Sequence, residues 1–313
     1  MKILFFSHDG KLGDAVVNTA FVAGVRALVP DAQIDVLASS ASMDFWRKHR
    51  DIRRVWKFQN PGLVECLKTS WAIRQEHFDY LVTFKRRFRS EKTRLMLALA
   101  NPTKGFIAEE GRQDGQIQHA VHKSRDSLNA IFGAAAADLP LNYQLGFDIA
   151  AASDMNASDG KTDVVLVNLF AAEPNRTVVT EVAAELLKEL SAVLPHSQLC
   201  LLCTEDTLVQ AEAAQMRSGV SCRIVNTQMD FTRLIAVCAR ADLIISPDTS
   251  LVHIASALGK PVLGIFQDDG IKSIEWAPRS VRSEIVIAPS KDSIHGFSVA
   301  EVVQKAQRLH AER

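Results

Sequence analysis

The sequence has no long apolar segment. No stretch approaches the roughly 18 consecutive apolar residues that a membrane-spanning helix requires. At the N-terminus the apolar run covers only residues 3–6, which is too short for the hydrophobic core of a signal peptide. We therefore expect a cytoplasmic protein that crosses no membrane, although it can still work at a membrane surface.

An excess of charge of one sign is also lacking. The 36 lysines and arginines balance the 36 aspartates and glutamates, so no overall field attracts the protein to nucleic acid or to anionic lipid. Such an attraction would have to come from a local patch. The sequence has no basic domain with interleaved aromatic residues either, and we therefore expect no nucleic-acid partner.

Cysteines are few and odd in number. Five cysteines in a chain of this length make a poor disulfide framework and favour the reducing cytosol. Cys200 and Cys203 have C-x-x-C spacing, but residues three apart on the strand expected there point to opposite faces, which argues against a redox or zinc site. The sequence also lacks an Asp-x-Asp motif in a suitable context. We predict no metal and no cofactor.

Apolar residues make up 47% of the chain and charged residues 23%, the balance of a globular protein with a substantial core. Short apolar runs alternate with segments of helical periodicity along the whole chain. This alternation predicts an α/β fold in which helices cover parallel sheets. The expected strands are residues 2–7, 33–38, 79–83, 164–168, 199–203, 243–246 and 262–266.

The segment 149–163 differs from its surroundings because its residues are small and polar. We predict a linker at residues 151–162, between an N-terminal domain at 1–150 and a C-terminal domain at 163–296. A closing helix is expected at 297–313. Two successive α/β units imply an interdomain cleft, and the ligands of parallel sheets bind beyond the carboxyl ends of the strands.

The most informative segment, residues 246–267, places a turn and a helix directly after an expected strand. The start of that helix directs free amides and a partial positive charge beyond the sheet, which suits a diphosphate. Thr249 and Ser250 add hydroxyl donors, and His253 lies in the first turns of the helix. Two alternatives stay open: Asp248 or Thr249 only caps the helix, and His253 is a packing or surface residue.

Polar residues follow other expected strands as well. Gly13 and Asp14 come after the first strand, where Asp14 acts in a site or stabilises the next helix start. Arg176 lies near a helix start, which is an unfavourable place for a cation and favours a functional role. Glu205 follows another strand, beside neighbours that can cap the next helix. Met229 lines a binding pocket or belongs to the core.

A basic run follows the strand expected at 79–83. It consists of Lys85, Arg86, Arg87, Arg89 and Lys92. One explanation is a solvated surface. The other is an anionic acceptor, because arginine pairs well with carboxylates and phosphates. His119 and His122 lie in a second loop of the same half and have no assigned role.

The segment 246–267 closely resembles the C-terminal signature of family 9 glycosyltransferases, the bacterial lipopolysaccharide heptosyltransferases. The matching residues are Asp248, Thr249, His253, Ala255, Ala257, Gly259 and Pro261. Gly13 and Asp14 also resemble the family's Gly-Asp pair. Two positions depart from the pattern: Ser250 replaces a glycine, and Arg176 replaces a lysine that contacts the donor phosphate.

The resemblance implies two facing Rossmann-like domains of GT-B architecture, the first for the acceptor and the second for the nucleotide-sugar donor. It implies inverting, metal-independent transfer of heptose from ADP-L-glycero-D-manno-heptose to Kdo or heptose of the lipopolysaccharide inner core, an anionic glycolipid. The protein would then work in the cytoplasm or peripherally on the inner face of the inner membrane. Asp14 would be the general base. The donor-binding residues would be Gly13, Arg176, Glu205, Asp248, Thr249, Ser250 and His253, and the acceptor-binding residues Lys85, Arg86, Arg87 and Arg89.

Two other functions stay open. The first is transfer from another nucleotide sugar to a capsule or protein acceptor. The second is nucleotide binding without catalysis, which the departures at Ser250 and Arg176 would support. A nicotinamide dehydrogenase is disfavoured because the chain has no G-x-G-x-x-G fingerprint after its first strand.

Overall fold

The computed structural model describes residues 1–7, 10–58, 62–85, 88, 90–108, 116–149 and 163–311. The chain divides into two compact units, Met1–Phe147 and Asp148–Arg313. The predicted linker at 151–162 lies outside the described residues, as do Arg86, Arg87 and Arg89 of the basic run. Within the described residues, no helix has the length and apolar character needed to cross a membrane.

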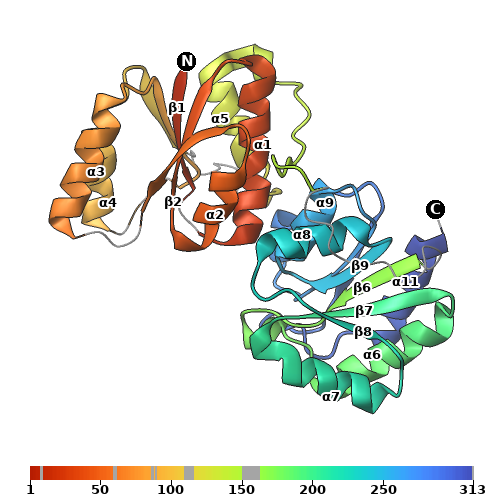
Figure 1. Ribbon diagram of the computed structural model, residues 1–313. Coiled ribbons are helices and arrows are strands. Elements are labelled where there is room, and N and C mark those ends of the chain that lie inside the picture. The colour runs from red at the N-terminus through yellow and green to blue at the C-terminus, as the bar shows by residue number, and fades with distance from the viewer. Residues whose placement is uncertain are drawn as a thin grey trace. The chain divides into compact units, whose positions relative to one another are not determined.

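The described residues of the first unit form a five-stranded parallel sheet in the order β3-β2-β1-β4-β5. Its strands are β1 (Lys2–Ser7), β2 (Gln33–Ala38), β3 (Ile52–Lys57), β4 (Tyr80–Thr83) and β5 (Gly105–Ala108). Its helices are α1 (Leu12–Leu28), α2 (Ser40–Lys48), α3 (Leu63–Gln75), α4 (Glu91–Ala100) and α5 (His122–Phe132). Figure 1 shows α3 and α4 on one face of this sheet and α1, α2 and α5 on the other.

Adjacent aromatic residues of β1 explain why helices cover both faces of the first sheet. Phe5 packs against Phe21 of α1, with the ring centroids 5.2 Å apart, and against Trp46 of α2. Phe6 points the other way, into a buried cluster with residues of α3 and α4. Neighbouring residues on a strand face opposite sides, so the run KILFFS buries an apolar side chain on each face.

The described residues of the second unit form a six-stranded parallel sheet in the order β11-β10-β9-β6-β7-β8. Its strands are β6 (Asp163–Asn168), β7 (Ser197–Cys203), β8 (Arg223–Asn226), β9 (Leu243–Pro247), β10 (Val262–Phe266) and β11 (Ser283–Ile287). Its α-helices are α6 (Thr180–Val193), α7 (Leu208–Ser218), α8 (Phe231–Arg240), α9 (Ser250–Ala257), α10 (Lys272–Glu275) and α11 (Val299–Ala311).

Both sheets have the strand order of doubly wound dinucleotide-binding folds, and the predicted α/β class is confirmed. In each unit the chain builds outward from a central strand in one direction, then returns to the other side of that strand. The direction reverses between β1 and β4 in the first unit and between β6 and β9 in the second. Ligands of such sheets bind at this reversal, beyond the carboxyl ends of the strands.

Four strands were not expected from the sequence: β3, β5, β8 and β11. All four lie at sheet edges. An edge strand has a neighbour on one side only and is less completely buried, so it does not need a continuous apolar run. The sequence of β3, IRRVWK, illustrates this, because its two arginines are exposed.

Candidate functional site

The predicted donor segment begins where β9 ends, beside the carboxyl end of β6. Ser246, the fourth residue of β9, is fully buried, and its Oγ accepts a hydrogen bond from Asn168 Nδ2 at 3.1 Å. The same Oγ lies 2.9 Å from Thr249 Oγ1. A chain of polar contacts therefore ties the end of β6, through Ser246, to Thr249, which directly precedes α9.

Thr249 is the N-cap of α9. Its Oγ1 accepts a hydrogen bond from Leu251 N at 3.3 Å, so the capping role that the sequence left open is present. Ser250 is the first residue of the helix and is half-buried. Its backbone is helical rather than left-handed, so the fold does not require glycine at this departure from the family pattern.

Asp248 and Arg176 form a largely buried ion pair next to this helix start. Arg176 Nη1 donates to the backbone oxygen of Asp248 at 2.7 Å and to its Oδ2 at 3.1 Å. A second nitrogen of the same guanidinium, Nη2, lies 2.8 Å from Glu173 Oε1. Arg176 thus fastens the loop after β6 to the turn after β9, and its positive charge lies at the base of α9.

Burial raises the pKa of the Asp248 carboxyl, and the nearby charges of Arg176 and Lys272 oppose this effect only in part. The Arg176 guanidinium that is hydrogen-bonded to this carboxyl offsets part of the cost of burying its charge. The pair therefore holds Arg176 in one orientation, with little freedom for its side chain.

His253 lies in the second turn of α9 with its side chain buried. Its ring packs edge-on against Trp276, with the centroids 5.7 Å apart. This contact agrees with the packing alternative that the sequence left open for His253. It also places Trp276, which follows α10, against the helix that carries the predicted donor residues.

Glu205 lies after β7 and is exposed. Its Oε2 accepts a hydrogen bond from Asn226 Nδ2, at the end of the adjacent strand β8, at 2.9 Å. Thr204 and Thr207 supply the capping contacts of the short helix here, so Glu205 is not needed as a cap. The carboxylate is thus held at the carboxyl ends of β7 and β8 and remains accessible.

The loop after β8 has an unusual backbone. Gln228 and Met229 both have positive φ, 53° and 60°, in a region that residues with a side chain seldom adopt. The Met229 side chain is 73% exposed, which excludes the core alternative for this residue. Strained backbone of this kind concentrates at binding sites. Here it exposes the apolar side chain of Met229, three residues after Asn226.

In the first unit, Asp14 lies in the first turn of α1, directly after the central strand β1. Its side chain is half-buried. Gly13 belongs to the same helical turn, whereas the sequence placed it in the preceding loop. The glycine that the loop needs is Gly10, which has a left-handed φ of 72° and faces Ser39 so closely that a Cβ would lie 2.0 Å from Ser39 Oγ.

The described part of the basic run begins after β4, on the other side of the reversal point from Asp14. Lys85 is exposed, and its amide donates to Thr83 Oγ1. Phe88 stacks on Phe6, with centroids 5.4 Å apart, and so anchors the run to the core. His119 accepts a hydrogen bond from Val121 N on Nδ1, which gives it a structural role at the start of α5.

No group of three or more potential metal ligands occurs among the residues that the structure describes. The five cysteines are buried free thiols. Burial raises the pKa values of Cys200 and Cys203, and that of Cys238 to about 12, which makes these thiols poor nucleophiles.

Sequence reasoning missed two residues that organise these sites, Asn168 and Asn226, and it had treated Gly10 and Gly13 together as the glycines of the first loop. The signal for Asn168 and Asn226 was weak but present, because each is a polar residue at the end of an apolar run. Their partners, Ser246 on β9 and Glu205 after β7, are distant in sequence, so the contacts could not be read from the chain.

The sequence pattern of glycosyltransferase family 9 (heptosyltransferase) matches residues 70–305. A solved family 9 glycosyl transferase from Veillonella parvula DSM 2008 is similar with a TM-score of 0.82 and 13% identity, over 100% of this chain and 98% of that chain. The E. coli ADP-heptose LPS heptosyltransferase II has a TM-score of 0.77 and 15% identity, over 100% and 99%.

The E. coli heptosyltransferase WaaC, solved with ADP, has a TM-score of 0.69 and 15% identity, over 99% of this chain and 100% of that chain. WaaC has also been solved with ADP-2-deoxy-2-fluoro heptose. At these identities the structural likenesses establish the fold. They confirm the prediction of two Rossmann-like domains of the GT-B class.

Proposed function

The chain belongs to glycosyltransferase family 9 and is therefore a glycosyltransferase, and we propose that it transfers heptose from ADP-L-glycero-D-manno-heptose to the lipopolysaccharide inner core. The observation that carries this proposal is the anchored start of α9. It is fixed by the Asn168–Ser246–Thr249 contacts and by the Arg176–Asp248 pair. A site held this rigidly loses little entropy when it binds an anion.

The donor diphosphate is proposed to bind at this helix start. The amides of the first turn and the helix dipole favour an anion, and Ser250 and Thr249 add hydroxyl groups. Gly13, which precedes the proposed base, would let the donor approach the first turn of α1 closely. Arg176 adds a fixed positive charge beside the phosphates, with Asp248 holding its guanidinium. His253 supports the helix from its buried side, against Trp276.

The nucleoside is proposed to bind beyond β7 and β8. Glu205 is exposed there, is oriented by Asn226, and can accept hydrogen bonds from two ribose hydroxyls. Met229 offers an exposed apolar side chain for the face of the base. That WaaC has been solved with ADP supports an adenine nucleotide in a fold of this kind.

For the chemical step, we propose Asp14 as the general base. The acceptor hydroxyl gives its proton to the Asp14 carboxylate while its oxygen bonds to the anomeric carbon of heptose. The bond from that carbon to the diphosphate breaks on the opposite face, so configuration inverts and ADP leaves with the electron pair. The α9 amides and Arg176 stabilise the charge that develops on the diphosphate, with no metal needed.

The acceptor is proposed to be an anionic glycolipid, Kdo or heptose of the inner core, reached from the cytoplasmic side of the membrane. Lys85, Arg86, Arg87 and Arg89 would bind its carboxylates or phosphates. The charge distribution supports this proposal. The chain has no net charge overall, so a basic run within it indicates a local preference for anions.

A donor comparison tests the proposal. Purified protein is incubated with heptose-deficient lipopolysaccharide and ADP-heptose, UDP-glucose or GDP-mannose, and the core is analysed by mass spectrometry. We expect a gain of one heptose with ADP-heptose only. Transfer from another sugar nucleotide would favour the alternative acceptor classes, and ADP binding by calorimetry without any transfer would favour a non-catalytic homologue.

A further inference from the structure

Helix α3 has a buried face and, beside it, an exposed apolar face. Its inner face packs into the first unit through Cys66, Ser70 and Ile73, all of which are buried. Its outer face carries four large apolar residues that the fold leaves exposed: Leu63 at 54%, Val64 at 66%, Leu67 at 43% and Trp71 at 66%. Packing in the core therefore explains only some of the apolar residues of α3.

The four exposed residues form one stripe. At 3.6 residues per turn they fall within an arc of roughly 100° along α3. Contiguous apolar surface of this kind, unlike a single exposed leucine, marks an interaction site in a folded protein. Trp71 is also the residue type that prefers the boundary between an apolar phase and water.

Exposed cations occur on α3 and on the neighbouring helix α4. Lys68 and Arg74 are exposed on α3 itself, and Lys92 and Arg94 are exposed on α4, which packs beside α3 (Figure 1). Their acidic neighbours are Glu65 and Glu91, and Glu91 pairs with Arg94 at 3.5 Å. The described residues of α3 and α4 therefore carry more exposed positive than negative charges in addition to the apolar stripe.

We propose that this α3–α4 surface, the apolar stripe with Lys68, Arg74 and Lys92, docks the protein on an anionic lipid bilayer. The stripe enters the boundary between headgroups and acyl chains, and the lysines and arginines pair with lipid phosphates. With 13 residues, α3 lies in the interface and is too short to cross the bilayer.

Charge favours a bilayer over a second copy of the chain. A symmetric dimer through this surface would bring the same cations of both copies together and remove them from water, which is unfavourable. An anionic bilayer neutralises them. The surface lies outside the proposed donor site. Docking would bring the enzyme to an acceptor held in a membrane, and only this role of the surface rests on the proposed function.

The test uses the full chain and vesicles of phosphatidylethanolamine and phosphatidylglycerol, with phosphatidylcholine vesicles for comparison. We expect flotation with the anionic vesicles and not with the neutral ones. Trp71 reports the contact directly, because Trp46 and Trp56 are buried and Trp276 is half-buried. Its emission should shift to the blue, and acrylamide should quench it less, when anionic vesicles are added.

Two paired variants identify the surface. Leu67→Glu/Trp71→Glu should lower the vesicle partition coefficient by at least about tenfold, and Lys68→Glu/Arg74→Glu by a similar factor at low salt. The matched controls are Val209→Glu/Met216→Glu, at two exposed apolar residues of α7, and Lys188→Glu/Lys291→Glu. Both controls should bind vesicles as the wild type does.

Vesicle binding that the α3 variants leave unchanged would overturn the proposal. So would a wild-type dimer, detected by light scattering, that Leu67→Glu/Trp71→Glu converts to a monomer while no vesicles are bound. Circular dichroism confirms that each variant is folded. Transfer to a detergent-dispersed acceptor should survive in the α3 variants, so failure of docking is distinguished from failure of the proposed transfer.

Discussion

The starts of α1 and α9 both lie at the reversal point of their sheets, α1 after the first strand of its unit and α9 after the fourth, and they are built differently. Each helix follows a strand at the point where its sheet reverses direction. The start of α9 is capped by Thr249, whose hydroxyl is tied to buried Ser246, and lies against the Arg176–Asp248 pair. The start of α1 has Lys11 as its N-cap residue, with no capping hydrogen bond from that side chain, and carries Asp14 half-buried in its first turn.

This difference matches the two chemical tasks that we propose. A diphosphate that must be held while its charge increases is served by fixed dipoles and a fixed cation. A general base must accept a proton from the acceptor hydroxyl, which requires an ionisable side chain that is not fully buried, and Asp14 is half-buried. The predictions below separate these roles, from the largest expected effect to the smallest.

Asp14→Asn should reduce kcat by about 10²- to 10⁴-fold, because the amide keeps the shape of the carboxylate but cannot accept the proton. The ADP dissociation constant, measured by calorimetry, should change little. Asp31→Asn removes an exposed carboxylate of the same unit and serves as the control. Near-normal turnover in Asp14→Asn would show that another group is the base.

Arg176→Met should destabilise the second unit by about 3 kcal/mol, since it leaves the buried Asp248 carboxylate without its partner. Denaturant unfolding measures this change, and ADP affinity should fall with it. Arg217→Met breaks the exposed pair with Glu181 and should cost less than about 1 kcal/mol.

The double variant Arg176→Met/Asp248→Asn separates the two effects of Arg176. It removes the unpaired charge, so stability should partly return while ADP affinity stays low. A double variant that regained full ADP affinity would contradict the proposed contact between Arg176 and the donor phosphates.

Thr249→Val should cost about 1 kcal/mol of unfolding free energy, because it removes the cap of α9 while keeping the side-chain shape. ADP binding should weaken in parallel, and Thr249→Ser should restore both. The corresponding change in the first unit, Lys11→Ala, should have little effect, because Lys11 provides no side-chain cap. If Thr249→Val and Lys11→Ala lowered the unfolding free energy equally, the two helix starts would not differ in how they are capped.

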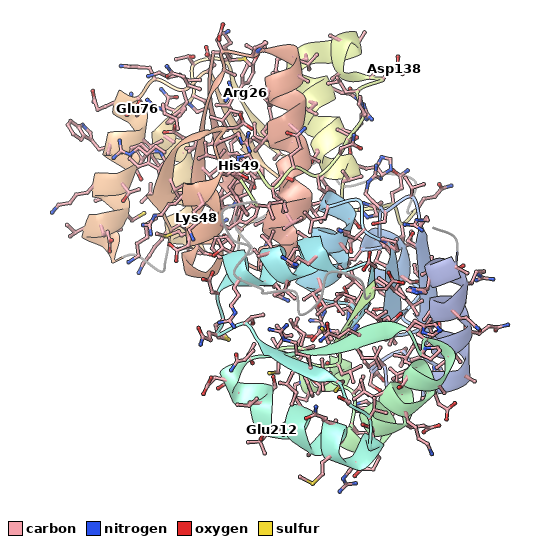
Figure 2. All side chains as sticks on the ribbon, turned by 45° about the vertical axis from the view of Figure 1, so that its right-hand side comes forward. Arg26, Lys48, His49, Glu76, Asp138 and Glu212 are labelled. Carbon is pink, nitrogen blue, oxygen red and sulfur yellow. The ribbon has the colours of Figure 1, made fainter. Side chains whose placement is uncertain are left out.

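The smallest effect concerns pH. His49 is buried at the end of α2 (Figure 2), where its Nε2 bonds the carbonyl oxygen of Gln144 and its Nδ1 accepts from Asp51 N. Burial lowers the pKa of this histidine, although the Gln144 contact and the charge of Asp51 oppose the shift. The unfolded chain therefore binds a proton first as the pH falls, and the first unit loses stability below about pH 6.5.

Asp248 has the opposite effect on the pH dependence of stability. Burial raises its pKa, so its folded state binds a proton first and the second unit gains stability as the pH falls through that raised value. Hydrogen exchange followed by mass spectrometry should show the first unit weakening relative to the second between pH 7.5 and 5.5. His49→Gln should reduce that difference, and His196→Gln, at an exposed site, should not.

Much of the fold followed from local patterns. The runs KILFFS and VLGIF are apolar on both faces, which only a strand covered by helices on both sides can bury. The edge strand β3 was missed because it carries two adjacent exposed arginines, Arg53 and Arg54, and so has no continuous apolar run. The position of Asp14 after a strand could also be read from the sequence, whereas Gly10, rather than Gly13, proved to be the glycine that shapes the loop.

What the sequence determined by itself is the alternation of strands and helices, and hence which residues follow a strand end. What only the tertiary structure decided is which of those ends meet. Asn168 contacts Ser246 across 78 residues, and Arg176 contacts Asp248 across 72. The physical reason is that hydrophobic periodicity and secondary-structure propensity act within a few residues. These contacts instead depend on the chain returning to place β9 beside β6.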